Sequence, residues 1–160
     1  MDINMSTHSE KAGKLFKEGY NCSQAVFTAF CDETGMEREI ALKLSSSFGA
    51  GMGRLREVCG ALTGIFMVAG IKFGYAGAED EESKAKHYEL VQEIAERFKR
   101  RNNSIICREL LGLGEGNSVP APDKRTAQYY EYRPCERLVR EAAEIMDCIL
   151  EEKAVFSIDE

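Results

Sequence analysis

Histidine is scarce in this chain, with only two copies in 160 residues. His8 and His87 lie far apart in the sequence, so neither a Ser-His-Asp nor a Cys-His arrangement can be argued from them. Strand-like alternation of apolar and polar residues is also absent, whereas helical spacing runs along almost the whole chain. These absences leave an all-α fold and give no support to histidine-based catalysis.

Long apolar runs and basic stripes are missing as well. The most apolar stretch, residues 58–73, is shorter than the about 20 residues that a membrane-spanning helix needs. The formal net charge of −6 argues against a nucleic-acid surface. The N-terminal residues lack the basic and apolar regions of a signal peptide. We therefore expect a cytosolic protein without nucleic-acid or membrane partners.

The chain has six cysteines, but no two of them form a CxxC pair. Without such a pair the protein cannot work as thioredoxin does, and it lacks the close ligand pairs of a zinc ribbon. In the reducing cytosol, cysteines are normally free thiols, so six of them indicate catalytic, redox or metal-binding roles before structural disulfides.

A glycine-rich loop leads to Cys59, and an apolar helical run follows at once. Residues 58–73 are apolar or small on nearly every side of a helix, which predicts a buried central helix with Cys59 at its N-terminal end. Gly60 and Gly64 share one face of that helix. Because glycine weakens a helix, this spacing predicts close approach of another backbone or of a bound group, with plain helix packing as the alternative.

Helical spacing predicts one all-α domain over residues 1–160, a compact bundle of about six or seven helices around the central one. Asn21 is expected to cap the second helix and Ser104 the sixth. In the third helix, Ile40, Ala41 and Leu44 are expected to face inward. The predicted helices are residues 9–19, 21–35, 37–46, 58–73, 79–101 and 105–111, and one that starts at Pro134.

Residues 112–133 are rich in glycine and proline and predict a loop of about 20 residues. A loop of that length is unusual in a compact domain, which indicates either a function or poor order. Tyr129, Tyr130 and Tyr132 close the loop. They either wall a site or pack the loop against the rest of the protein.

Four cysteines fall in the first turns of four different predicted helices: Cys22, Cys59, Cys107 and Cys135. A helix N-terminus presents unpaired N–H groups and a partial positive charge of roughly half an elementary unit. Both effects stabilise a thiolate and lower the pKa of a thiol. We expect the four N-termini to converge on one pocket suited to negative sulfur.

The other two cysteines do not fit this pattern. Cys31 lies about half a turn around the helix from Cys22, and Cys148 lies late in the last helix, so both are expected to be small buried hydrophobes. Near neutral pH, Cys59 should therefore be alkylated faster than either of them, with Arg54 and Arg56 just upstream adding positive charge.

Taken together, these motifs resemble the CGAxxG four-cysteine family of redox-active proteins, the C_GCAxxG_C_C type. Residues 59–64 match its signature, residues 20–26 resemble its first cysteine motif, and residues 48–53 resemble its glycine-rich approach. Cys107 and Cys135 occupy the places of its third and fourth cysteines. The resemblance implies a redox role or a metal–sulfur site on the four cysteines, with no established substrate.

The leading hypothesis is a redox protein that uses Cys22, Cys59, Cys107 and Cys135 for thiol–disulfide or electron-transfer chemistry. Its redox partner is unknown, and a homo-oligomer is compatible with the sequence. The alternative is a binding module in which the same four thiolates hold an iron–sulfur cluster or a single metal ion.

A third hypothesis concerns the glycines. Gly49, Gly51 and Gly53, together with Arg54 and Arg56, could form a nest of backbone N–H groups for an anion, or simply a flexible connection. Replacing Gly51 or Gly53 with valine is expected to disturb the cysteine site more than the fold. The candidate residues for contact with a bound group are Gly49, Gly51, Gly53, Gly60 and Gly64.

Overall fold

The structure, a computed structural model, describes residues 7–115 and 118–158. Within these ranges the regular elements are helices, and the one β feature is an isolated antiparallel bridge between Val58 and Ile106. Six helices have eight or more residues, which confirms the predicted all-α bundle. The elements are α1 (His8–Lys17), α2 (Cys22–Ala29), α3 (Cys31–Thr34), α4 (Arg38–Ser45), the 3-10 helix η1 (Ser46–Phe48), α5 (Gly49–Met52), α6 (Gly60–Phe73), α7 (Glu81–Asn102), α8 (Cys107–Leu110), α9 (Ala127–Tyr132) and α10 (Cys135–Ile158).

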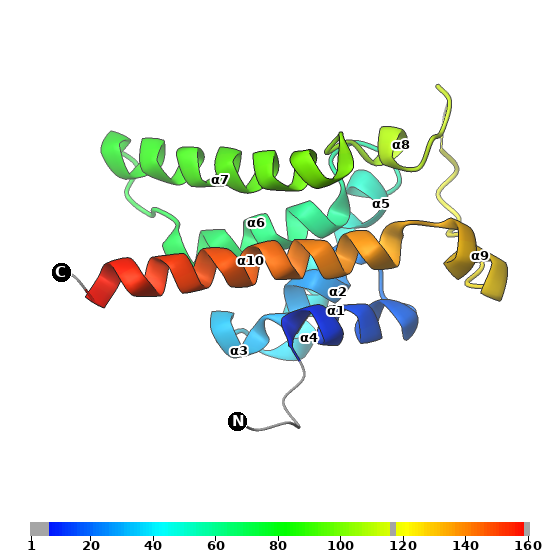
Figure 1. The fold of residues 1–160 in the computed structure, drawn as a ribbon, viewed down its shortest axis with the longest axis horizontal. Coiled ribbons are helices and arrows are strands. Elements are labelled where there is room, and N and C mark those ends of the chain that lie inside the picture. Colours follow the sequence, from blue (N-terminus) through cyan, green and yellow to red (C-terminus); the bar gives the residue numbers. More distant parts are fainter. Residues whose placement is uncertain (1–6, 116–117, 159–160) are drawn as a thin grey trace.

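Helix α6 is the central helix that the apolar run predicts. It packs against α2, α7 and α10, and Figure 1 shows the long helices α7 and α10 running alongside it. Its N-terminal part is buried on all sides, whereas Ile71 near its C-terminal end is 44% exposed. Across the described ranges, no helix combines the length and the apolar character needed to cross a membrane.

Helices α2 and α6 cross at the two glycines of the CGAxxG motif. A Cβ atom built on Gly64 would lie 2.9 Å from Val26 Cβ, and one built on Gly60 would lie 2.4 Å from Cys22 Sγ. A well-packed interior has no room for either added methyl group. Helix packing therefore accounts for Gly64, while Gly60 leaves the space that a cysteine sulfur occupies.

The start of α2 is held by a capping box, as the sequence predicts for Asn21. Gln24 N donates to Asn21 Oδ1 at 2.9 Å, and Asn21 N donates to Gln24 Oε1 at 3.1 Å. Gln24 Nε2 also donates to the Leu42 carbonyl at 3.0 Å, and Asn21 Nδ2 to that of Ser46 at 3.1 Å. These bonds tie the first turn of α2, and with it Cys22, to α4 and η1.

Helix α4 turns a different face inward from the one expected. Ala41 and Ser45 are buried, but Ile40 is 58% exposed and Leu44 is 49% exposed. The expectation for Ile40 and Leu44 is therefore wrong. The main contacts of α4 are with α2 and η1, and its buried residues, Ala41 and Ser45, lie one turn apart on a single face.

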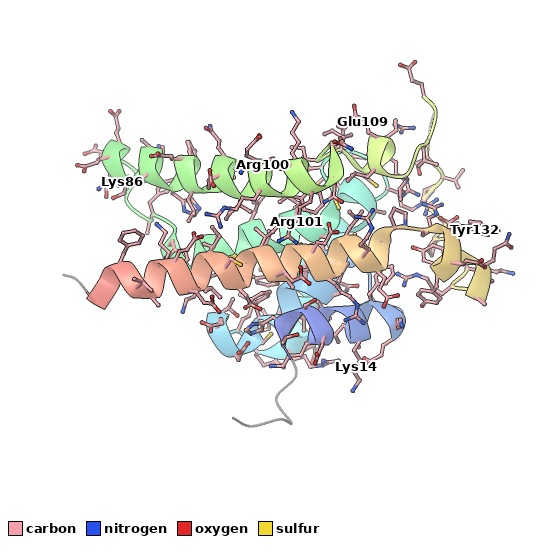
Figure 2. All side chains as sticks on the ribbon, in the orientation of Figure 1. Lys14, Lys86, Arg100, Arg101, Glu109 and Tyr132 are labelled. Atoms are coloured by element: carbon pink, nitrogen blue, oxygen red, sulfur yellow. The ribbon has the colours of Figure 1, made fainter. Side chains whose placement is uncertain are left out.

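The loop predicted for residues 112–133 contains a helix. Tyr129 N donates to Thr126 Oγ1 at 3.1 Å, and this cap starts α9. Tyr129 and Tyr130 lie against the Phe16 ring of α1, whereas Tyr132 is 73% exposed and points away from the bundle (Figure 2).

Ser104 does not cap α8 as expected. The N-cap of α8 is Ile106, and the Ser104 hydroxyl accepts a hydrogen bond from Ile106 N at 3.0 Å.

His8 joins three helices near the start of α1. Its Nδ1 atom lies 2.6 Å from Asp147 Oδ1 in α10, its Nε2 atom lies 2.9 Å from Asp32 Oδ1 in α3, and its ring stacks on Phe30 at 4.1 Å. Burial lowers the pKa of His8, but the hydrogen bonds and charges of Asp147 and Asp32 raise it by more. The net pKa is raised, so the folded protein favours the protonated imidazole.

Two glycines of α6 should respond in opposite ways to alanine. Gly64→Ala should lower the free energy of unfolding by about 1–3 kcal/mol, because the new methyl group overpacks the contact with Val26. Gly70→Ala should raise it by up to about 1 kcal/mol, because the added Cβ meets no atom within 4 Å and alanine favours a helix. Urea unfolding followed by circular dichroism measures both. Equal effects at the two positions would show that the crossing does not depend on Gly64.

The His8 bridge predicts a pH-dependent contribution to stability. Because the folded pKa of His8 is raised, its stabilisation is complete below the unfolded pKa of about 6.5 and is lost as the pH rises through the folded pKa. At about pH 6, His8→Gln should lower the free energy of unfolding by about 1 kcal/mol, and by less at about pH 9. His87→Gln, outside this bridge, is the control. A His8→Gln effect that stays constant over this pH range would contradict the prediction.

Candidate functional site

The four cysteines singled out by the sequence all begin helices. Cys22, Cys107 and Cys135 are the first residues of α2, α8 and α10, and Cys59 is the N-cap of α6. All four line one cavity of about 320 Å³. It involves α5, α8, α9 and the start of α10, which lie at the same end of the bundle (Figure 1). The structure therefore brings the four together, while their chemical role stays a prediction.

The Cys22 sulfur lies against the first turn of α6. It occupies the space beside Gly60 that a side chain would fill, and it accepts a hydrogen bond from Ala50 N at 3.4 Å. The position of the Cys22 sulfur therefore explains why the residue after Cys59 is a glycine. Any larger residue there would displace the sulfur of Cys22.

The segment around the glycine loop has an unusual backbone. Five consecutive residues from Ala50 to Arg54 have positive φ, with values of 55° at Ala50, 69° at Met52 and 68° at Arg54. Left-handed backbone costs about 1–2 kcal/mol for a non-glycine residue, so the surroundings must hold this turn in place. The left-handed turn includes Ala50, whose N–H is the one that bonds the Cys22 sulfur.

Gly51 lies beneath the third cysteine. A Cβ on Gly51 would lie 2.7 Å from Cys107 Cβ and 2.8 Å from Arg56 Cα, and its φ is +70°. By contrast, a Cβ on Gly53 would come no closer than 3.7 Å to Ser47 O. Gly49, Gly53 and Gly60 line the cavity, whereas Gly51 is packed behind it and Gly64 packs on α2. A role for these glycines in holding a bound group stays a prediction.

A short backbone bridge aligns the second and third cysteines. Cys59 N donates to the Ile105 carbonyl at 2.8 Å, and Cys107 N donates to the Glu57 carbonyl at 2.6 Å. This pairing, centred on Val58 and Ile106, sets the starts of α6 and α8 side by side. An isolated bridge has no pattern in the sequence, so sequence reasoning could not find it.

Arg56 is the charged residue most deeply placed in the site. Its side chain is 5% exposed, and its Nη1 atom donates to Cys107 Sγ at 3.6 Å. Its Nη2 atom lies 4.0 Å from Asp123 Oδ2, and its Nε atom is buried without a hydrogen-bond partner. A guanidinium held on a sulfur is the kind of contact that stabilises a thiolate.

Three further charged residues of the cavity come from the segment before α10, and sequence reasoning missed them. Asp123 Oδ2 lies 3.4 Å from Arg54 Nη1 and 3.0 Å from Arg133 Nη2. Arg125 donates to the carbonyls of Phe16 and Tyr20 at 2.8 and 3.0 Å. These contacts hold residues 123–133 over the cavity. No local sequence motif predicts that position.

The pKa values of the site cysteines correct one expectation from the sequence. Burial raises the pKa of Cys22, raises that of Cys59 well above its ordinary value, and raises that of Cys135 to about 12. Charges on neighbouring cysteines add to the increase, and backbone N–H groups oppose it for Cys22 and Cys59. Backbone N–H groups lower the pKa values of Cys22 and Cys59, but the loss of water outweighs them. The expectation of lowered pKa values is therefore wrong for these three thiols.

The two outlying cysteines also differ from expectation. Cys148 is exposed and Cys31 is half-buried, so neither is the small buried hydrophobe that the helical pattern suggests. Cys59, in contrast, is only 5% exposed. The predicted rapid alkylation of Cys59 relative to Cys148 is therefore contradicted by both its burial and its raised pKa.

The metal alternative requires ligands that converge. Among residues 7–115 and 118–158, no three side chains of histidine, cysteine, aspartate or glutamate come together as a ligand group for a metal ion. Four thiolates that hold a cluster or a zinc ion would all contact the same centre. The observed arrangement of the cysteines therefore does not fit a cluster or a zinc ion held by all four thiolates.

A family model described as "Putative redox-active protein (C_GCAxxG_C_C)" matches residues 20–149, a range that contains all four cavity cysteines. The motif in that description reads G-C-A-x-x-G, whereas residues 59–64 of this chain read C-G-A-L-T-G. No curated protein and no solved structure matched.

The burial of the thiols predicts a new order of reactivity. Exposed Cys148 should be alkylated first by iodoacetamide at about pH 7, and Cys59 and Cys135 last. Because these two pKa values are raised, their rates should still be rising beyond about pH 9, where an unperturbed thiol with a pKa of about 8.5 is already mostly ionised. Mass spectrometry at each cysteine measures the rates, and protein unfolded in urea provides the control. Equal native rates for Cys59 and Cys148 at about pH 7 would refute this order.

Proposed function

Because the chain belongs to the C_GCAxxG_C_C family of redox-active proteins, we propose that it carries out thiol–disulfide exchange with the cysteines of its cavity. The observation that carries this proposal is that four helix starts place Cys22, Cys59, Cys107 and Cys135 in the lining of one cavity. A cavity lined by several thiols allows two of them to be oxidised together while the product stays shielded from water. We also propose a reducing compartment, the cytosol, where such thiols are normally free.

Cys107 is the proposed attacking residue. It is the cysteine whose sulfur receives a hydrogen bond from a buried guanidinium, that of Arg56 at 3.6 Å. The thiolate is the nucleophile in disulfide exchange, and a nearby positive charge favours it. Gly51 supports this position from behind, because a side chain there would push on both Cys107 and Arg56.

Cys22 is the proposed second thiol of the reaction. It lines the same cavity, and the charge of Cys107 is the cysteine charge that raises the Cys22 pKa. A raised pKa suits a residue that stays protonated until the first exchange step is complete. The hydrogen bond from Ala50 N then favours its thiolate once the proton has left.

The exchange is written as two balanced steps. The Cys107 thiolate attacks one sulfur of a substrate disulfide, forms a mixed disulfide and releases the first substrate thiolate. That thiolate takes the proton of Cys22, and the Cys22 thiolate attacks the Cys107 sulfur. This second attack forms a Cys22–Cys107 disulfide and releases the second substrate thiolate, so two protein thiols are oxidised and one substrate disulfide is reduced.

Disulfide mapping tests the proposal. Reduced protein, purified without oxygen, is equilibrated in thiol–disulfide buffers of graded potential, and free and bonded cysteines are then labelled separately and identified by mass spectrometry. We expect a reversible loss of two thiols with Cys22 and Cys107 in one disulfide. Cys22→Ser should accumulate the mixed disulfide at Cys107, and Cys107→Ser should abolish the exchange.

The double variant Cys31→Ser, Cys148→Ser is the matched control, because neither residue lines the cavity. It should show the same midpoint potential as the unaltered protein. Retention of six free thiols at every potential would refute thiol–disulfide exchange. Metal and sulfide counts on the same sample test the cluster alternative, and stoichiometric iron and sulfide would overturn the proposal.

A further inference from the structure

We infer that the cavity binds a small organic anion, and that the disulfide reduced there is a small molecule that bears carboxylate groups. This inference rests on the proposed function and names its substrate class. The first observation is the charge of the cavity wall. Among the described residues that line it, four arginines, Arg54, Arg56, Arg125 and Arg133, stand against one carboxylate, Asp123. The whole chain carries a net charge of −6, so this local excess of positive charge opposes the general trend.

An unsatisfied donor points to a missing acceptor. Arg56 is 95% buried, and its Nε atom has no hydrogen-bond partner although the residue lines the cavity. A buried donor without an acceptor destabilises the folded protein, and the free-energy cost is larger when the donor belongs to a charged group. A carboxylate is the acceptor that matches a guanidinium best, because two oxygens meet two N–H groups.

Asp123 already shows how a carboxylate meets this wall. One of its oxygens lies 3.0 Å from Arg133, 3.4 Å from Arg54 and 4.0 Å from Arg56. A single carboxylate therefore faces three guanidinium groups, and two positive charges remain uncompensated among these four side chains. Since Asp123 is 42% exposed on the segment before α9, a ligand carboxylate can join it or take its place.

The remaining lining suits the rest of a small molecule. Apolar side chains of Phe16, Leu110, Leu111 and Leu138 complete the cavity, whose volume of about 320 Å³ admits a compact ligand. A second hollow on the outer side shares Arg54, Arg56, Asp123 and Arg133 with the cavity. Arg54 and Arg133 are 16% and 25% exposed, whereas buried Arg56 contacts the Cys107 sulfur. This arrangement would place a carboxylate on the arginines and a sulfur on Cys107 at once.

Binding is tested first with a probe that cannot be reduced. Thiodipropionate is a thioether with two carboxylates, and thiodiglycol is its uncharged counterpart. Calorimetry with the reduced protein should show binding of thiodipropionate alone, about tenfold or more weakened in Arg56→Gln and partly restored in Arg56→Lys. Asp123→Asn should tighten binding about threefold to tenfold, because a competing carboxylate is removed. Arg100→Gln, on the exposed surface of α7, removes the same charge and should change nothing.

Asp123→Asn also keeps the inference testable if Arg56→Gln fails to fold, which circular dichroism would reveal. The second arm compares oxidation of the protein by dithiodipropionate, hydroxyethyl disulfide and cystamine, which are anionic, neutral and cationic disulfides. We expect the anionic disulfide to react about tenfold faster than the neutral one and the cationic one to be slowest. Exchange at equal rates with all three would leave the proposed function standing and overturn the anion site. Arg56-dependent binding of thiodipropionate without any disulfide exchange would support the anion site and overturn the proposed function.

Discussion

The crossing of α2 over α6 is the contact on which the rest of the structure depends. Gly60 and Gly64 remove two side chains from one face of α6, and Cys22 and Val26 of α2 occupy that space. Both pairs are four residues apart, so one helical repeat fits against another. The same close approach that packs the core brings the sulfur of Cys22 to the helix that Cys59 begins.

The cavity combines two opposing electrostatic effects. Helix starts supply N–H groups that favour thiolates, yet burial raises the pKa values of Cys22, Cys59 and Cys135 because water is lost around them. At Cys107, the buried guanidinium of Arg56 donates a hydrogen bond to the sulfur. Burial thus disfavours the thiolate at these three cysteines, while the Cys107 sulfur has a guanidinium beside it.

Several parts of the site could be predicted from sequence because their causes are local. Asn21 and Gln24 form a cap over three residues, Gly60 and Gly64 follow a helical repeat, and the apolar run of α6 predicts its burial. Other expectations failed where the outcome depends on what covers a helix. Ile40 and Leu44 have inward spacing but are exposed in the fold, and Cys148 is exposed on α10.

The sequence by itself placed the four cysteines in the first turns of four helices, because periodicity and capping act within a few positions of the chain. The exact start of α8, at Cys107, differs from the predicted one. Tertiary structure alone decided that Cys107 lies beside Cys59, through the bridge between Val58 and Ile106. It also decided that Asp123 and Arg133 close over Arg56. Desolvation and pairing of distant charges depend on neighbours from other segments, so the raised pKa values of Cys22, Cys59 and Cys135 are a property of the folded cavity.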